Sequence, residues 1–143
     1  MMRLNVMLLY ISLSLFIFSS SFAQKPIQPN NWPLNKFEKP IENPILKADS
    51  TFIFTDPIKK KIVRWQRADV FNPGAIVKDN KVFLLYRAED NPAAILGGRT
   101  SRLGLAESTD GIHFTKHPEP VLFPDNDASQ EYAFPGGCED PRL

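Results

Sequence analysis

The chain has 143 residues, enough for one domain, and its 43% hydrophobic content is sufficient for a packed core. Its 17 basic and 16 acidic residues nearly balance, which leaves no electrostatic footprint for nucleic acid or an anionic membrane. The single cysteine, Cys138, excludes a disulfide within these residues.

The first 23 residues have the pattern of a secretory signal peptide. Arg3 provides the positive start, an apolar run extends from Val6 to Phe18, and Ser21-Phe22-Ala23 places small residues where signal peptidase cleaves. The apolar run is shorter than the ~20 residues of a bilayer span, so we expect cleavage before Gln24 and no stable membrane insertion afterwards. The mature protein is therefore predicted to be periplasmic or secreted.

Residues 24–66 are a proline-rich lead-in without a visible helical or strand period. Their apolar side chains are irregularly spaced, at Trp32, Phe37, Ile41, Ile45 and Leu46. Proline favours extended connections here and in residues 118–141. We predict that residues 24–66 form an extended strap across a larger domain.

Residues 67–143 are predicted to begin a β-domain. A strand over residues 69–78 bends at Pro73-Gly74, and the two-residue turn Asp79-Asn80 joins it to a second strand over residues 81–87. The apolar run of this second strand is nearly continuous, which suggests burial on both faces.

An exposed loop over residues 90–100 then leads to a third strand over residues 101–108, and a fourth strand is predicted to begin at Ile112-His113-Phe114. Four sequential antiparallel strands form a meander of the kind found in one β-propeller blade. No run of residues has a convincing helical period. Because one blade cannot bury both of its faces, we expect these residues to be the front of a longer protein and to be inactive alone.

Polar residues on these strands and near the end of the chain have the composition of a sugar-binding site. Carboxylates and guanidinium groups form paired hydrogen bonds to vicinal hydroxyls. Arg87 is the hardest to explain as a surface charge, because it follows the most hydrophobic strand and a buried charge needs a partner or a ligand. The set comprises Asn72, Arg87, Glu89, Asp90, Arg102, Glu139, Asp140 and Arg142.

The segment Gly136-Gly137-Cys138-Glu139-Asp140-Pro141-Arg142 is the densest part of this set. Its glycine pair allows a sharp turn, and a carboxyl group whose pKa is raised by burial can protonate a leaving group. An ordinary surface turn with a local ion pair is the alternative. No metal site is predicted, because His113 and His117 lie on a strand-like segment and would not share a helical face.

Six segments resemble, in order and spacing, those of glycoside hydrolase family 130, which contains β-mannoside phosphorylases and some β-mannosidases. The match covers about the last half of the chain and the front of the family's domain. The segments are Phe71-Asn72-Pro73-Gly74-Ala75, Leu84-Leu85-Tyr86-Arg87-Ala88-Glu89, Ser101-Arg102-Leu103-Gly104-Leu105-Ala106, Ser108-Thr109-Asp110-Gly111-Ile112-His113-Phe114, Pro118-Glu119-Pro120-Val121-Leu122 and Gly136-Gly137-Cys138-Glu139-Asp140-Pro141-Arg142.

The resemblance implies an all-β, five-bladed β-propeller, of which this chain holds the strap, one blade and the start of the next. It implies that Asp140, in the family's Glu-Asp-Pro-Arg motif, is the general acid and that its proton reaches the glycosidic oxygen through a sugar hydroxyl. The residues expected to bind the substrate are Asn72, Arg87, Arg102, Glu139 and Arg142.

The expected reaction is inverting cleavage of a β-mannosidic bond in an oligosaccharide by inorganic phosphate, without a cofactor. An inverting phosphorylase needs one protein carboxyl group, because phosphate itself attacks, whereas an inverting hydrolase needs a second carboxylate to activate water. An exported β-mannosidase is the alternative, because phosphorolysis saves energy mainly inside the cell. A non-catalytic sugar-binding propeller is the second alternative.

Overall fold

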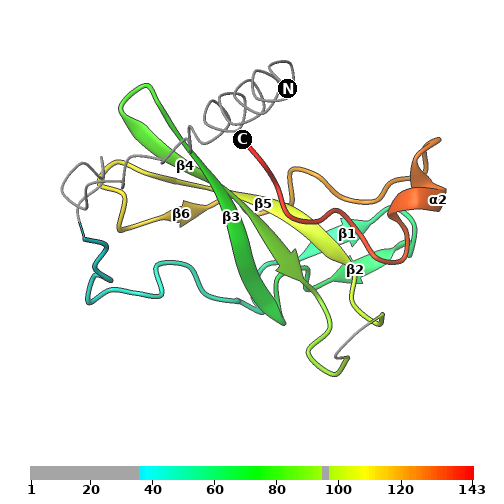
Figure 1. Cartoon of the computed structure of the whole chain (residues 1–143). Helices are drawn as coiled ribbons and strands as arrows, with labels where there is room; N and C mark the ends of the chain where they lie inside the picture. Colours follow the sequence, from blue (N-terminus) through cyan, green and yellow to red (C-terminus); the bar gives the residue numbers. More distant parts are fainter. Residues whose placement is uncertain (1–35, 95–96) are drawn as a thin grey trace, which may run out of the picture. The chain divides into compact units, whose positions relative to one another are not determined.

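The computed structural model describes residues 36–94 and 97–143, and its folded unit begins at Lys39. Among its described residues, the regular secondary structure of this unit is β-strand apart from one helical turn, which confirms the all-β prediction. Among the described residues, no helix has the length and apolarity needed to cross a bilayer. The elements are β1 (Phe54–Asp56), β2 (Lys61–Val63), β3 (Asp69–Lys78), β4 (Lys81–Glu89), β5 (Ser101–Ser108), β6 (Thr115–Lys116) and α2 (Gln130–Ala133) (Figure 1).

The main sheet is an antiparallel meander in the order β3-β4-β5-β6, as the sequence predicted. Asp79 and Asn80 form the two-residue turn between β3 and β4, and both have positive φ angles, which suit the tight hairpin turns that follow the twist of the strands. The register of β3 shifts between Phe71 and Gly74, so the bend predicted at Pro73-Gly74 is a β-bulge.

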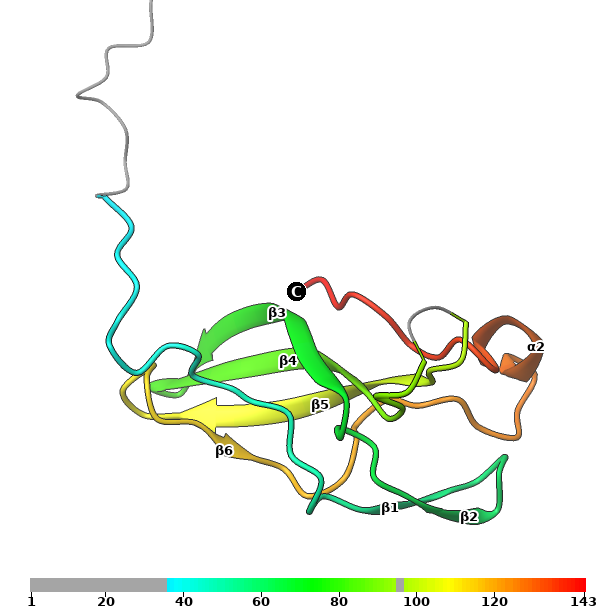
Figure 2. The ribbon, with the colours of Figure 1, turned by 90° about the horizontal axis from the view of Figure 1, so that it is seen from below.

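The two faces of the sheet carry different segments. The β1–β2 hairpin lies on one side, and the C-terminal segment runs along the other (Figure 2). Side chains alternate between the faces of a strand, so Tyr86 and Ala88 point toward the hairpin, whereas Arg87 and Glu89 point toward the C-terminal segment. This alternation decides which polar residues can meet.

The hydrophobic core lies between the sheet and the lead-in. Trp65 is fully buried against Tyr86, at 6.3 Å between ring centroids, and its indole N–H donates to the Pro118 carbonyl oxygen. Complete burial of one large apolar side chain stabilises a fold by about 1.5–3 kcal/mol. The core comprises Phe54, Trp65, Tyr86, Ala88 and Ala106.

Residues 24–66 were predicted to form an extended strap and showed no strand period, but in the part that the structure describes β1 and β2 form a hairpin. Each strand has only three residues, too few for an alternating pattern to be visible in the sequence. The turn between them is built by the Asp56 carboxylate, which accepts hydrogen bonds from the backbone N–H groups of Ile58 and Lys59. The predicted signal peptide and residues 24–35 lie outside the described residues.

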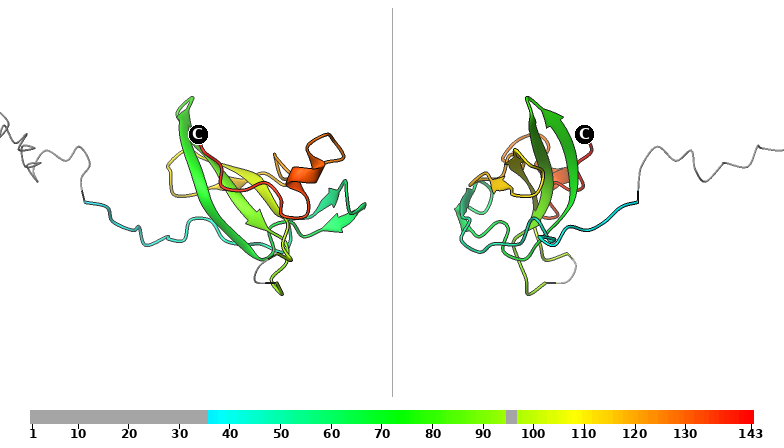
Figure 3. Two further views of the ribbon diagram at one scale, coloured as in Figure 1. Left: turned by 45° about the vertical axis from the view of Figure 1, so that its right-hand side comes forward. Right: turned by 90° about the vertical axis from the view of Figure 1, so that its left-hand side faces the viewer.

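The proline-rich stretch after residue 118 was predicted to be an extended connection, but it contains one helical turn, α2. The Asp127 carboxylate accepts a hydrogen bond from the Ser129 N–H just before this turn. The loop before α2 is attached to the β1–β2 turn, since Asn126 Nδ2 donates to the Pro57 carbonyl oxygen, and α2 lies at the same end of the sheet as the hairpin (Figure 3).

Two further expectations about the strands need correction. The fourth strand begins at Thr115 and not at Ile112, because the Asp110 carboxylate accepts hydrogen bonds from the N–H groups of Ile112 and His113 and holds them in a turn. Burial of β4 on both faces is only partial among the described residues: Leu84 is buried on one face, whereas on the other face Glu89 is buried but Leu85 is half-buried and lines an apolar groove.

Candidate active site

Four of the six predicted site residues meet on the face of the sheet along which the C-terminal segment runs. Asn72 Nδ2 donates to Asp140 Oδ1 at 2.9 Å, and Arg87 Nη1 donates to the same oxygen at 3.3 Å. Arg87 Nη2 donates to Glu139 Oε1 at 2.8 Å. The chain thus brings together side chains from β3, β4 and the C-terminal segment.

The backbone is unusual at both ends of the Asn72–Asp140 hydrogen bond. Asn72, in the bulge of β3, has a φ of 47°, and Asp140 has a φ of 45°. Positive φ is uncommon for residues other than glycine, and such conformations cluster at functional sites. The bulge turns Asn72 toward the C-terminal segment, where a regular strand would continue its pleat.

The segment carrying Glu139 and Asp140 is held on β5 by its backbone. The Ser101 N–H donates to the Gly136 carbonyl oxygen at 2.8 Å, and the Cys138 N–H donates to the Ser101 carbonyl oxygen at 2.9 Å. Gly137 lies between these two bonds with a φ of 107°. The position of the carboxylates therefore depends on one short backbone bridge to the first residue of β5.

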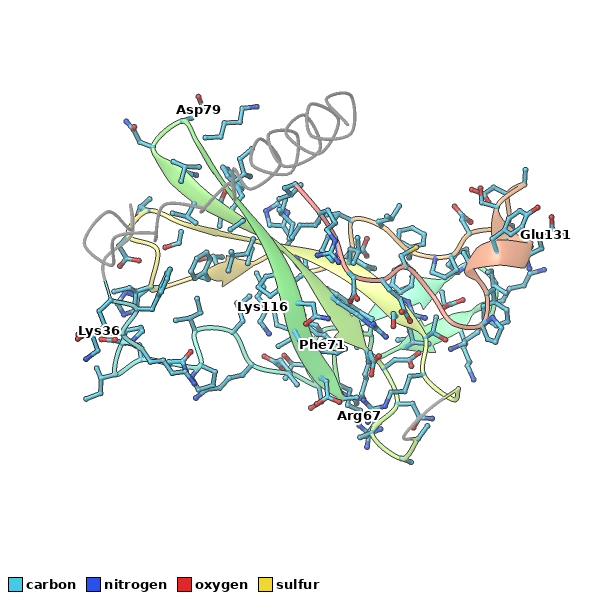
Figure 4. All side chains as sticks on the ribbon, in the orientation of Figure 1. Lys36, Arg67, Phe71, Asp79, Lys116 and Glu131 are labelled. Carbon is cyan, nitrogen blue, oxygen red and sulfur yellow. The ribbon has the colours of Figure 1, made fainter. Side chains whose placement is uncertain are left out.

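Arg87 is the centre of the cluster. Its side chain is 15% exposed and packs over the Phe71 ring of β3, with 4.8 Å from the guanidinium carbon to the ring centroid (Figure 4 labels Phe71). Its Nε donates to Ser101 Oγ, and its Nη2 donates to Glu89 as well as to Glu139. The sequence analysis expected a partner or a ligand for the charge of Arg87, and in the structure its partners are protein carboxylates.

Asp140 is held in its charged form. Hydrogen bonds from Asn72 and Arg87, together with the positive charges of Arg87 and Arg142, lower the pKa of its carboxyl group. Its side chain is 46% exposed, so the described residues do not supply the burial that the sequence analysis invoked to raise this pKa. To act as an acid, Asp140 must first take up a proton, which requires its pKa to rise when substrate or further chain covers it.

The structure does not bring Arg102 to this cluster. Arg102 follows Ser101 on β5 and therefore faces the hairpin, where its fully buried guanidinium pairs with Asp56 and Asp90. Burial acts to raise the pKa of Asp56, but hydrogen bonds from the Lys59 N–H and from Arg102 outweigh it and lower that pKa. Arg102 therefore joins β5 to the hairpin and to the loop after β4.

Sequence reasoning missed two contributors to the site, Ser101 and Arg99. Ser101 holds the C-terminal segment, and Arg99 pairs with Glu89, which in turn contacts Arg87. The spacing of Arg87 and Glu89, two apart on one strand, places both on one face and could have indicated their pairing. Among the described residues, no three His, Cys, Asp or Glu side chains are grouped to hold a metal ion.

An all-β scaffold that presents carboxylates, a guanidinium and an amide on one face is typical of proteins that bind or cleave carbohydrates. Comparison with known proteins agrees with this class. The model of glycoside hydrolase family 130, described as beta-1,4-mannooligosaccharide phosphorylase, matches residues 36–143. The chain belongs to this family, which confirms the resemblance drawn from the six motifs.

Three relatives illustrate the similarity. The 1,2-beta-oligomannan phosphorylase of Thermoanaerobacter sp. (strain X514) is 45% identical over 80 residues, which are 55% of this chain and 25% of the relative. A glycosyl hydrolase from Bacteroides ovatus, of known structure, is 44% identical with a TM-score of 0.75, over 80% of this chain and 32% of that one.

The third is a solved structure connected with the finding that this family of mannoside phosphorylases contains glycoside hydrolases that target β-1,2-mannosidic linkages in Candida mannan. It is 44% identical, with a TM-score of 0.75, over 83% of this chain and 33% of that one. The chain thus spans no more than a third of the length of these relatives.

Proposed function

We propose that the protein cleaves β-mannosidic bonds in oligosaccharides with inversion and that Asp140 is the general acid. The observation that carries the proposal is the arrangement of Asp140 on Asn72 and Arg87 in a chain of a family of mannoside-cleaving enzymes. The Asp140 side chain is 46% exposed among the described residues, which leaves its carboxyl group accessible to a sugar.

In the proposed reaction, inorganic phosphate attacks the anomeric carbon on the face opposite the acid as the bond to the leaving oxygen breaks. The leaving oxygen takes its proton from Asp140 by way of a sugar hydroxyl. Asn72 and Arg87 orient the carboxyl group, and Glu139 and Arg142 supply hydrogen bonds to sugar hydroxyls. Inorganic phosphate is a co-substrate, and the reaction uses no cofactor.

We further propose that the sheet is one blade of a five-bladed β-propeller whose central funnel holds the site. The meander order of the four strands supports this, as does the half-buried apolar groove that contains Leu85, which has the character of a surface packed against a neighbouring blade. Residues 24–66 are the strap and residues 67–143 the start of this domain.

Phosphorolysis is favoured over hydrolysis by the description of the matching family model and by the phosphorylase from Thermoanaerobacter. Hydrolysis by an exported β-mannosidase is the second candidate, since two of the similar solved structures are described as hydrolases or linked to them. The predicted signal peptide also supports the hydrolase, because sugar phosphates are used mainly inside cells.

One assay separates the two reactions. We expect the full-length protein, incubated with a β-mannooligosaccharide and inorganic phosphate, to release mannose 1-phosphate, and to be nearly inactive without phosphate. Product analysis by anion-exchange chromatography distinguishes the phosphate ester from free mannose. Release of free mannose at the same rate with and without phosphate would identify a hydrolase and contradict the phosphorylase proposal.

Export is tested separately. We expect N-terminal sequencing of the protein from the periplasm or medium to begin at Gln24, because the apolar run and the small residues before it match a signal peptidase substrate. Recovery of an intact Met1 from the cytoplasm would show that residues 1–23 are not a signal peptide. The site proposal does not depend on this result.

A further inference from the structure

We propose that Glu89 and Arg99 are positioning residues that determine, through Arg87, how strongly Asp140 is held as a carboxylate. This inference rests on the proposed role of Asp140 as the acid and extends it to two residues that do not contact Asp140. It assigns a function to the chain of ion pairs that continues behind Arg87 into the loop after β4.

The chain of ion pairs is continuous. Glu89 has a side chain only 7% exposed, and its two carboxylate oxygens bind different cations: Oε1 accepts from Arg87 Nη2 at 2.8 Å, and Oε2 accepts from Arg99 Nη1 at 2.6 Å. Arg99 also pairs with Asp69 at the start of β3. The ion pairs therefore run from Asp69 through Arg99 and Glu89 to Arg87, which contacts Glu139 and Asp140.

Arg87 forms ion pairs with three carboxylates, and its distances to them are unequal. Its Nη2 lies 2.8 Å from both Glu89 and Glu139, whereas its Nη1 lies 3.3 Å from Asp140. The bond to Asp140 is the longest of the three. When the ion pair between Arg87 and Glu89 strengthens or weakens, the hydrogen bond from Arg87 to Asp140 therefore changes in the opposite direction.

Among the described residues, the positive charges that act on Asp140 are those of Arg87 and Arg142. Arg87 contacts it from β4, and Glu139 and Arg142 flank it on its own segment. Asn72, which contacts it from β3, is neutral. Of the two cations, Arg87 alone forms an ion pair with Asp140, so Arg87 is the route by which more distant residues act.

The two residues are expected to act in opposite directions. Glu89→Gln removes a negative charge and releases Arg87 toward Asp140, which lowers the pKa of Asp140 further. Arg99→Gln leaves Glu89 without its second cation, so Glu89 draws Arg87 away from Asp140 and the pKa of Asp140 rises. A purely structural role predicts loss of activity in both variants with no such difference in sign.

The experiment measures kcat against pH for the full-length enzyme at saturating β-mannooligosaccharide and fixed phosphate. The alkaline limb of the profile marks the pH at which the acid loses its proton in the complex. We expect this limb to move by about 0.5–1 pH unit to lower pH in Glu89→Gln and by a similar amount to higher pH in Arg99→Gln. Ionisation of phosphate is common to all variants and does not affect these differences.

A double variant tests whether Arg99 acts through Glu89. If it does, Glu89→Gln/Arg99→Gln has the profile of Glu89→Gln alone, because without the Glu89 carboxylate the loss of Arg99 changes no charge that contacts Arg87. Arg99→Lys, which keeps the charge, is expected to restore the limb toward its wild-type position. The proposed route would be overturned if the shift in the double variant equalled the sum of the two single shifts. Failure of Arg99→Lys to restore the limb would overturn it as well.

Folding is followed by circular dichroism and thermal unfolding. If Glu89→Gln does not fold, Asp69→Asn replaces it: Asp69 is 53% exposed, and its loss commits Arg99 more fully to Glu89, so the limb moves slightly to lower pH. The inference would be refuted if the alkaline limb stayed at the wild-type pH in these variants. It would also be refuted if the limb moved in the same direction in Asp69→Asn and in Arg99→Gln. Asp140→Asn in the same assay distinguishes this from failure of the proposed function, since wild-type activity there refutes the acid itself.

Discussion

Replacing Asp140 with asparagine in the full-length protein is expected to lower kcat by a factor of ~10²–10⁴ and to change substrate binding little. Asparagine has the shape of aspartate and can still accept the hydrogen bond of Asn72, but it has no proton to give to the leaving group. The rate of mannose or mannose 1-phosphate release, with KM determined in parallel, measures this loss.

The dependence on the leaving group is the control for this substitution. A β-mannoside with an acidic leaving group, such as a dinitrophenol, needs less help from a proton, so the loss should be smaller there than with a natural oligosaccharide. If Asp140→Asn kept wild-type rates on an unactivated mannoside, Asp140 would not be the acid. Sugar binding without cleavage by the full-length wild-type protein would instead favour the non-catalytic sugar-binding alternative.

Replacing Gly137 with alanine is expected to reduce kcat/KM by about 10²-fold or more, although residue 137 carries no reactive group. A Cβ at this position would lie within 3.0 Å of the Ser101 backbone, and the φ of 107° is strained for any residue but glycine. The segment must move away from β5, and a displacement of about 1 Å at a catalytic group costs on the order of 10²-fold.

The neighbouring glycine offers a matched control. A Cβ at Gly136 would meet no atom within 4 Å, so Gly136→Ala is expected to keep nearly wild-type kcat/KM. Thermal unfolding of both variants separates a local shift of the acid segment from general loss of structure. Equal activity of Gly137→Ala and Gly136→Ala would show that the backbone bridge to Ser101 does not position Asp140.

The sequence predicted the elements whose determinants are local. The β3–β4 hairpin follows from Asp79-Asn80 between two runs rich in β-forming residues, and the bulge follows from Pro73-Gly74. The β1–β2 hairpin was missed because three-residue strands carry too little periodicity. The fourth strand was placed too early because Ile112 is apolar, while the Asp110 carboxylate, through hydrogen bonds to the backbone, keeps it in a turn.

The site shows the same limit. The sequence singled out Asn72, Arg87 and Asp140 from residue type and from the family motifs, and the structure brings these three together. It could not separate Arg102 from them, because the faces of β4 and β5 are matched only by the register that pairs Glu89 with Ser101. That register puts Ser101 on the site face and Arg102 on the hairpin face.

The sequence by itself indicated the all-β class, the meander and the family, because each depends on residue types at short separations, and the resemblance to the family singled out Asp140 as the candidate acid. Only the tertiary structure decided the ionisation state of Asp140 and the partners of Arg87. These depend on which charges lie within a few ångströms, and electrostatic interactions fall off with distance in space and not with separation along the chain. Arg87 and Asp140 are 53 residues apart in the sequence, yet Arg87 Nη1 lies 3.3 Å from Asp140 Oδ1 in the fold.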